Sequence, residues 1–206
     1  MRSLGELGAA TLGESGAAAL APRVKPVWPG AIVVGPAFAV VCAPGDNLAV
    51  HVAVAEAPAG SVLCVEVEGQ PQLGWWGEVL TTGAQARGIA GLVIDACVRD
   101  VEALERLQFP VFSIGIALPG AQKKGPGRIG ASARVGDVEI ATGDVIVGDR
   151  DGVVAIPAER LDAVQAAGDA RAAKEADYFD ALRAGTTTVD LLDLDTVSIS
   201  RDFSAK

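Results

Sequence analysis

The segment from residue 61 to residue 114 alternates between short apolar runs and helix-like stretches, and this alternation restricts the chain to few folds. Strands are expected at 61–67, 91–95 and 110–114, with helices at 78–87 and 101–107 between them. Val101, Leu104 and Leu107 fall on one face of the second helix, as an amphipathic helix requires. Strands separated by helices predict βαβ units and a parallel sheet.

The segments on either side of this region follow a different pattern. Residues 135–156 alternate short apolar runs with Gly-Asp turns, and Asp151-Gly152 between two apolar runs predicts a β-hairpin. The apolar run 31–43 predicts a strand pair or one bent strand, broken at Gly35-Pro36. The expected fold class is therefore α/β with mixed parallel and antiparallel strands.

The two ends of the chain are expected to be helical or extended. A short helix is predicted at Leu12–Leu20, beginning at Thr11 or Ser15. Pro157 begins a long helix, 158–184, which ends at Gly185. Its expected apolar stripe contains Leu161, Val164, Ala172, Phe179 and Leu182. Residues 1–185 then form a single domain, and residues 186–206 form a C-terminal tail that docks on another subunit or is mobile.

Composition and charge restrict the partners and the compartment. The formal net charge is −9, and an acidic surface repels phosphate backbones, so no nucleic acid partner is expected. Cys42, Cys64 and Cys97 are far apart in the sequence and form no C-x-x-C motif, which is typical of reduced thiols in a cytosolic protein. Neither a signal peptide nor a membrane span is visible. We therefore expect a soluble cytoplasmic protein with no membrane partner.

The stretch 74–100 contains the strongest candidate site. In open α/β sheets ligands bind beyond the carboxyl ends of the strands, and Arg99-Asp100 follows the predicted strand 91–95. Free backbone amides at the start of the helix, near Gly77–Leu80, favour an anion. An arginine binds carboxylates, and one aspartate with water molecules is typical of a magnesium site. The pattern indicates a small acid held with a divalent metal, although an Arg-Asp pair at a strand end is commonly a surface ion pair or a helix cap.

Several other features have a structural or a functional interpretation. His51, the only histidine, is expected to be a packing residue with satisfied hydrogen bonds. Trp75-Trp76 are expected in the core, with a pocket wall as the alternative. Gly125–Gly130 spells G-x-G-x-x-G, but no helix follows it, so it is not interpreted as a dinucleotide site. The chain has no G-x-S-x-G, Walker or zinc motif.

The block from Trp76 to Val101, W-G-E-V-L-T-T-G-A-Q-A-R-G-I-A-G-L-V-I-D-A-C-V-R-D-V, resembles the RraA-like family. This family includes the 4-hydroxy-4-methyl-2-oxoglutarate and 4-carboxy-4-hydroxy-2-oxoadipate aldolases. The resemblance covers roughly residues 8–185, and it extends to 42–51, 109–112, 120–123, 143–147 and 151–154. It implies a swivelling β/β/α sandwich assembled as a homotrimer or hexamer, with sites between subunits.

The resemblance also implies roles for individual residues. The backbone of Gly77, Glu78, Val79 and Leu80, with the side chain of Arg99, would hold the pyruvoyl part of a substrate. Asp100 would anchor Mg²⁺ or Mn²⁺, directly or through water, and the metal with Arg99 would stabilise the pyruvate enolate.

Two further residues and the identity of the base have alternative interpretations. Lys123 would supply positive charge near the site, or it is a solvated loop lysine. Glu14 would be a catalytic residue that reaches the site of a neighbouring subunit, or it is a solvated helix carboxylate. The base that removes the hydroxyl proton would be a metal-linked water or Glu14 from that neighbour.

The function that this resemblance implies is a divalent-metal-dependent class II pyruvate aldolase, a carbon–carbon lyase. It would cleave 4-hydroxy-4-methyl-2-oxoglutarate or 4-carboxy-4-hydroxy-2-oxoadipate to pyruvate plus a keto acid, with oxaloacetate decarboxylase activity in addition. The alternative is a non-catalytic regulator of ribonuclease activity. Such regulators tend to lack the metal aspartate, so Asp100 favours the enzyme. The third alternative is a methyltransferase. The lack of a convincing S-adenosylmethionine loop argues against it.

Overall fold

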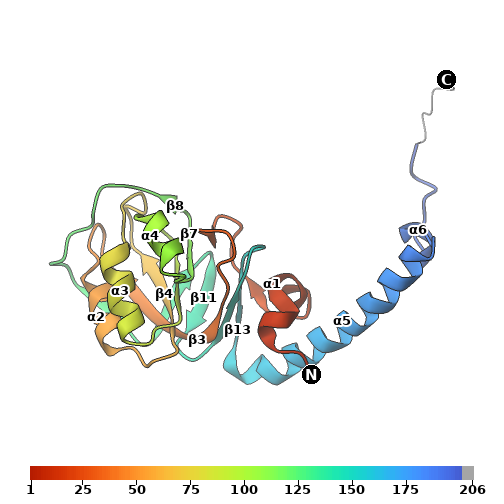
Figure 1. Cartoon of the computed structure of the whole chain (residues 1–206), viewed down its shortest axis with the longest axis horizontal. Coiled ribbons are helices and arrows are strands. Elements are labelled where there is room, and N and C mark those ends of the chain that lie inside the picture. Colours follow the sequence, from red (N-terminus) through yellow and green to blue (C-terminus); the bar gives the residue numbers. More distant parts are fainter. Residues whose placement is uncertain (201–206) are drawn as a thin grey trace.

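The computed structural model describes residues 1–200, and its centre is a mixed β-sheet. The parallel part consists of β3 (Val33–Cys42), β4 (Val62–Val67), β5 (Gly91–Ile94) and β7 (Val111–Ser113). The connecting helices α2 (Leu48–Glu56), α3 (Glu78–Ala86) and α4 (Val101–Arg106) lie together on one side of the sheet (Figure 1). The βαβ units predicted from the alternating sequence are confirmed.

Antiparallel strands complete the sheet at both edges. β12 (Val145–Gly148), β13 (Val153–Ile156) and β1 (Ala18–Ala19) extend it beyond β3, while β2 (Lys25–Pro26) pairs with β7. The predicted hairpin at Asp151-Gly152 joins β12 to β13. β9 (Gly127–Ile129) pairs antiparallel with β3. Two separate two-stranded sheets are formed by β10 (Ser132–Val135) with β11 (Val138–Ala141), which are antiparallel, and by β6 (Cys97–Val98) with β8 (Gly115–Ile116), which are parallel. The predicted α/β class with mixed strands is confirmed.

Strand β3 links the parallel and antiparallel parts of the sheet. Residues 33–36 pair antiparallel with β12, and residues 37–42 pair in parallel with β4. The Gly35-Pro36 step therefore marks a change of partner within one strand, so the expected strand pair does not form. Gly35 lies where the two parts meet, and a Cβ added there would be 2.7 Å from the carbonyl oxygen of Gly60. Only a residue without a side chain fits that approach.

We expect Gly35→Ala to destabilise the fold by about 1–3 kcal/mol, because the added methyl group meets rigid backbone. Urea unfolding monitored by circular dichroism measures this change. Gly13→Ala is the control, because its Cβ would meet the Val154 side chain at an ordinary 3.7 Å. Equal stability of the two variants would show that the contact at Gly35 relaxes without cost.

The N-terminal helix lies earlier in the chain than the sequence suggested. α1 covers Leu4–Glu14, so the predicted helix at Leu12–Leu20 is wrong. Ser3 and Glu6 form a capping box in which each side chain accepts a hydrogen bond from the other's backbone N–H. Gly16, with φ of 104°, then turns the chain toward β1. The capping box fixes the start of the helix, and the glycine prevents its continuation.

The long C-terminal helix α5 (Leu161–Arg183) follows a short 3₁₀ turn at Ala158–Arg160 and agrees with the predicted helix at 158–184. It leads away from the body and ends near α6 (Thr188–Leu191) (Figure 1). In the predicted apolar stripe Val164 is buried and Leu161 and Ala172 pack beside it, whereas Phe179 is 50% exposed. The predicted tail is exposed at Leu192 and Leu194, and its residues 201–206 lie outside the described part.

The main core lies beneath α2, α3 and α4, and Trp75 and Trp76 are fully buried in it. Cys42 and Cys64 are also buried, and burial raises the pKa of the Cys42 thiol to about 12. That thiol therefore stays protonated at neutral pH. Within residues 1–200, no helix combines the length and apolar character needed to cross a membrane.

Candidate functional site

A pocket of about 160 Å³ lies beyond the carboxyl ends of the parallel strands. It is lined by residues from four separate segments: Asn47 and His51; Gly74–Gly77, Val79 and Leu80; Arg99 and Asp100; and Gly120, Ala121 and Lys123. The structure thus brings together Gly77, Val79, Leu80, Arg99, Asp100 and Lys123, which the sequence predicted to share a site. Of the residues predicted there, Glu78 and Glu14 do not line this pocket.

The side chain of Asp100 reaches across to the start of α3. Asp100 is the N-cap residue of α4, but its carboxylate makes no capping hydrogen bond to that helix. Instead Oδ2 accepts a hydrogen bond of 3.0 Å from the backbone N–H of Glu78, and it lies 3.8 Å from Nε of Arg99. Asp100 has a left-handed backbone, with φ of 58°. Such a conformation is uncommon for a residue other than glycine and is often found at functional sites.

Two glycines provide the space that Arg99 and Asp100 occupy. A Cβ on Gly77 would lie 2.4 Å from Oδ2 of Asp100, and a Cβ on Gly74 would lie 3.0 Å from Cδ of Arg99. Gly77 has extended backbone angles that any residue adopts, so a glycine is needed here for its missing side chain and not for its backbone conformation. The backbone N–H of Arg99 donates to the carbonyl of Trp76 at 2.9 Å and holds the two segments together.

The pocket offers several groups to an anion. The N–H groups of Val79 and Leu80, in the first turn of α3, have no hydrogen-bond partner among residues 1–200. The guanidinium of Arg99 is loosely held, with a 3.5 Å contact from Nη1 to the carbonyl of Leu118. Lys123 adds a second cation, while the side chain of Asp100 is the only carboxylate in the lining. The pocket is therefore locally cationic within an acidic protein.

Glu78 contributes to the site through its backbone. Its N–H is engaged by Asp100, and its carboxylate accepts a 2.6 Å hydrogen bond from Arg106 of α4. The predicted binding of substrate by the amide of Glu78 therefore requires the Asp100 carboxylate to move. The N–H groups of Val79 and Leu80 have no hydrogen-bond partner in the part of the chain that the structure describes, so they can bind a substrate without movement of Asp100.

Two residues of the pocket, Asn47 and His51, were not predicted from the sequence to belong to the site. His51 was expected to have satisfied hydrogen bonds, but its Nε2 is buried and has no partner, so that expectation is wrong. Burial lowers the pKa of His51, and the positive charge of Lys123 lowers it further, while Asp46 acts in the opposite direction. The spacing of Asn47 and His51 was the sequence signal that could have placed both in one site, because residues four apart in a helix lie on one face.

The arrangement of donors fits a hard divalent cation held by one protein carboxylate. Among residues 1–200, no group of three or more His, Cys, Asp or Glu side chains is arranged to hold a metal. Oδ1 of Asp100 accepts no hydrogen bond from those residues and is open to a cation. Mg²⁺ and Mn²⁺ suit oxygen ligands, and Mg²⁺ keeps several waters, whereas a structural zinc site needs four protein ligands.

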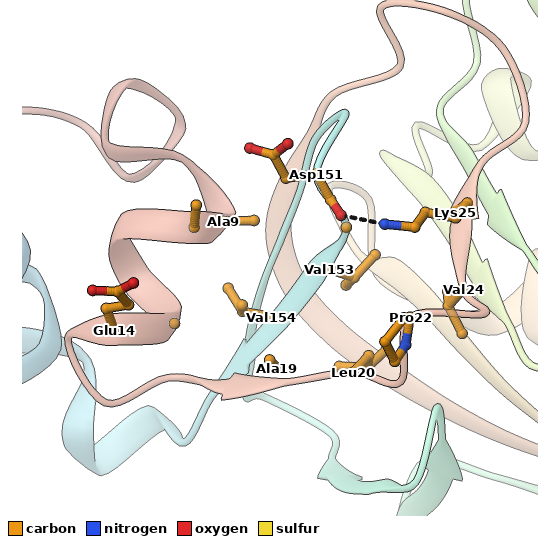
Figure 2. A pocket seen from close by; sticks show the side chains of 13 residues that line it. Ala9, Glu14, Ala19, Leu20, Pro22, Val24, Lys25, Asp151, Val153 and Val154 are labelled. Carbon is orange, nitrogen blue, oxygen red and sulfur yellow. Dashed lines mark hydrogen bonds between the residues drawn. The ribbon is translucent and has the colours of Figure 1, made fainter. Parts of the chain in front are cut away.

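Glu14 lies at a second pocket, of about 310 Å³, between α1 and the β1–β13 edge of the sheet (Figure 2). It forms an ion pair with Arg171 of α5. The pocket wall is mostly apolar, and Lys25 donates a 2.6 Å hydrogen bond to the carbonyl of Asp151 across its edge (Figure 2). Since Glu14 does not line the Arg99 pocket of its own chain, the predicted catalytic role requires a neighbouring subunit.

The sequence matches known proteins over most of its length. The family described as "RraA-like: Aldolase/RraA" matches residues 9–155. The chain is 41% identical over 138 residues to a Halalkalibacterium halodurans protein named "Putative 4-hydroxy-4-methyl-2-oxoglutarate aldolase". That match covers 67% of this chain and 66% of the relative, so the chain spans just under two thirds of the relative's length.

Solved structures agree with this match. A crystal structure of an uncharacterized protein from Pseudomonas syringae pv. tomato has a TM-score of 0.77 and 28% identity, covering 86% of this chain and 85% of that one. The RNA-processing inhibitor RraA from "Thermus thermophilis" has a TM-score of 0.66 and 25% identity, covering 76% of this chain and 94% of that one. The matching family, the aldolase-named relative and the shared fold together show that the chain belongs to the RraA-like family.

Proposed function

We propose that this protein is a divalent-metal-dependent pyruvate aldolase that cleaves 4-hydroxy-4-methyl-2-oxoglutarate or 4-carboxy-4-hydroxy-2-oxoadipate, with oxaloacetate decarboxylase activity. The observation that supports this most is the convergence of Arg99, Asp100 and the unengaged amides of Val79 and Leu80 in one pocket. These groups suit a 2-oxo acid beside a cation. The presence of Asp100 favours the enzyme over a regulator of ribonuclease activity.

The residues of the chain have distinct tasks in this proposal. The amides of Val79 and Leu80 hold the carboxylate next to the keto group, and Arg99 holds the same end of the substrate. When the carbon–carbon bond breaks, a base, either a water molecule or Glu14 of a neighbouring subunit, takes the hydroxyl proton and a new keto acid forms. The electron pair of the broken bond passes to the pyruvate enolate, which then takes a proton from water at its terminal carbon to give pyruvate. Arg99 stabilises the charge that develops on the enolate oxygen. A metal held by Asp100 would supply Lewis-acid polarisation of the keto oxygen.

The size of the pocket favours a small substrate. The volume of the pocket is about 160 Å³. Pockets for drug-sized ligands begin at about 300 Å³. The pocket therefore suits a small keto acid better than a nucleoside cofactor, which argues against a methyltransferase. Lys123 is positioned to attract a second carboxylate, which the proposed substrates carry.

The test of this proposal is pyruvate release from each of three substrates: oxaloacetate and the two hydroxy-oxo acids. Each is measured with Mg²⁺, with Mn²⁺ and with EDTA. We expect turnover with either metal and loss of turnover with EDTA. Absence of turnover on all three substrates, with folded protein and metal present, would contradict the enzyme and favour the regulator. Turnover that EDTA does not reduce would contradict the metal.

We expect Arg99→Lys to lower kcat/KM for each substrate by about 100-fold, because a lysine cannot form two parallel hydrogen bonds with a carboxylate. Initial rates over a range of substrate concentrations measure this effect. Arg106→Lys is the matched control, because Arg106 contacts Glu78 on the outside of the pocket. Equal activity of the two variants would remove Arg99 from the proposed site.

A homotrimer or hexamer is part of the same proposal, since a role for Glu14 requires a second copy of the chain. Light scattering measures the mass in solution, and a monomer would contradict this assembly. Mixing inactive Asp100→Asn protein with inactive Glu14→Gln protein then tests the shared site. Recovery of activity after the two variants are unfolded and refolded together would support catalysis between subunits, and no recovery in the mixed trimers would contradict it.

A further inference from the structure

Two buried polar atoms without partners lie in residues of the same pocket. Among the described residues, Oδ1 of Asn47 and Nε2 of His51 are the buried side-chain nitrogen or oxygen atoms that lack a hydrogen bond. Asn47 is only 4% exposed, so its side chain has little contact with bulk water. An unpaired buried polar group costs about 1–3 kcal/mol. Both residues line the same small pocket, so a ligand bound there is a candidate partner for these atoms.

The orientation of Asn47 is fixed by its surroundings. Its Nδ2 donates a 2.8 Å hydrogen bond to the carbonyl of Trp75, which identifies the nitrogen and leaves Oδ1 as the unpaired atom. Its backbone N–H donates to the carbonyl of Gln122 at 2.9 Å. The backbone N–H of His51 donates to the carbonyl of Asn47 at 3.3 Å, one helical turn later. Both side chains therefore come from one anchored turn.

The chemistry of the two atoms selects the kind of ligand group. An amide oxygen accepts hydrogen bonds or binds a cation, so its partner is a donor or a metal ion, and a carboxylate or keto oxygen is neither. A neutral imidazole nitrogen either donates or accepts. An alcohol donates through its hydrogen and accepts through its oxygen, so its chemistry matches both the acceptor Oδ1 of Asn47 and a protonated Nε2 of His51.

We propose that Asn47 and His51 form a subsite for the alcohol group of the substrate, in the same pocket as the groups that hold its 2-oxo acid end. This inference rests on the proposed function and specifies which substrates the pocket selects. Oxaloacetate carries no hydroxyl group, whereas both hydroxy-oxo acids do. The subsite therefore favours aldol cleavage over decarboxylation.

The first experiment compares His51→Leu with His51→Gln. The amide nitrogen of glutamine lies close to the position of Nε2, whereas leucine has no polar atom. His51→Leu is expected to lower the ratio of kcat/KM for 4-hydroxy-4-methyl-2-oxoglutarate to that for oxaloacetate by about tenfold or more, and His51→Gln to restore most of it. Glu56→Gln, at the exposed end of α2 and outside the pocket, is the control and should leave the ratio unchanged.

Two results would overturn the subsite. An unchanged ratio in His51→Leu would show that the residue does not distinguish the hydroxyl group. A glutamine variant as impaired as the leucine variant would show that the histidine acts by another route, such as proton transfer. Circular dichroism of both variants shows whether the fold is retained, and Asn47→Ala gives an independent measurement at the second atom.

The second experiment needs no turnover. 2-Hydroxyglutarate and glutarate differ by one hydroxyl group, and neither has the keto group that cleavage requires. We expect calorimetry with Mg²⁺ to show tighter binding of 2-hydroxyglutarate to the wild type, and equal binding of both acids to His51→Leu. If the wild type bound 2-hydroxyglutarate more tightly than glutarate but cleaved no substrate, the proposed function would be contradicted and the subsite would still be supported. Cleavage of the substrates by a wild type that binds 2-hydroxyglutarate and glutarate equally would support the proposed function and contradict the subsite.

Discussion

Replacing Asp100 by asparagine is expected to lower kcat/KM for oxaloacetate and for the hydroxy-oxo acids by at least about 100-fold. Asparagine keeps the size of the side chain and an oxygen that accepts from the N–H of Glu78, so the local structure should be retained. The negative charge is lost, and with it the one carboxylate in the pocket that would hold a divalent metal. Initial rates with increasing Mg²⁺ measure the effect.

Glu102→Gln is the matched control for Asp100→Asn. Glu102 is an exposed carboxylate in the first turn of α4, two residues from Asp100, and it does not line the pocket. Its loss changes the net charge by the same amount and should leave the rates unchanged. If Asp100→Asn retained wild-type rates with the same dependence on Mg²⁺, Asp100 would not be the metal residue.

The second large effect is expected from a single methyl group. In Gly77→Ala the added Cβ would lie 2.4 Å from Oδ2 of Asp100 and 3.2 Å from Cγ of Arg99. The Asp100 carboxylate must move away from the N–H of Glu78, because a non-bonded carbon and oxygen do not approach so closely. We expect kcat/KM to fall by about 10-fold to 100-fold, since a displacement of about 1 Å in a catalytic group costs up to about 100-fold.

Gly83→Ala separates this local effect from a general effect on α3. Its Cβ would meet the Val54 side chain at an ordinary 3.6 Å, so activity should be unchanged. Its stability should rise by about 0.5–1 kcal/mol, as for other glycines replaced inside helices. Rates and urea unfolding are measured for both variants. Full activity of Gly77→Ala would show that the space beside Asp100 is not needed.

The order of elements was predictable because local patterns specify it. The buried strands β4, β5 and β7 are short apolar runs, and α3 and α4 lie between them where the sequence indicated. The hairpin at Asp151-Gly152 followed from its turn residues. The start of α1 was missed, although the capping box at Ser3 and Glu6 is also a local signal.

The partner exchange along β3 was not predictable from local patterns. Gly35-Pro36 predicts a break in a strand. Strand β3 nevertheless continues through this step, because β12 and β4 pair with successive parts of β3. Likewise α5 carries apolar residues at helical spacing, yet Phe179 stays exposed in the single chain. Spacing shows which residues share a face and does not show what covers that face.

The sequence by itself determined the α/β class, the helix-start amides near Gly77–Leu80 and the Arg99-Asp100 pair, because each depends on neighbours along the chain. The tertiary structure alone decided that Asp100 bonds to Glu78, that Gly74 and Gly77 make room for the two side chains, and that Asn47 and His51 share their pocket. These facts depend on distances between segments that meet only when the parallel strands align their carboxyl ends. The physical reason is that hydrogen bonds and steric contacts act over a few ångströms, whatever the separation in sequence.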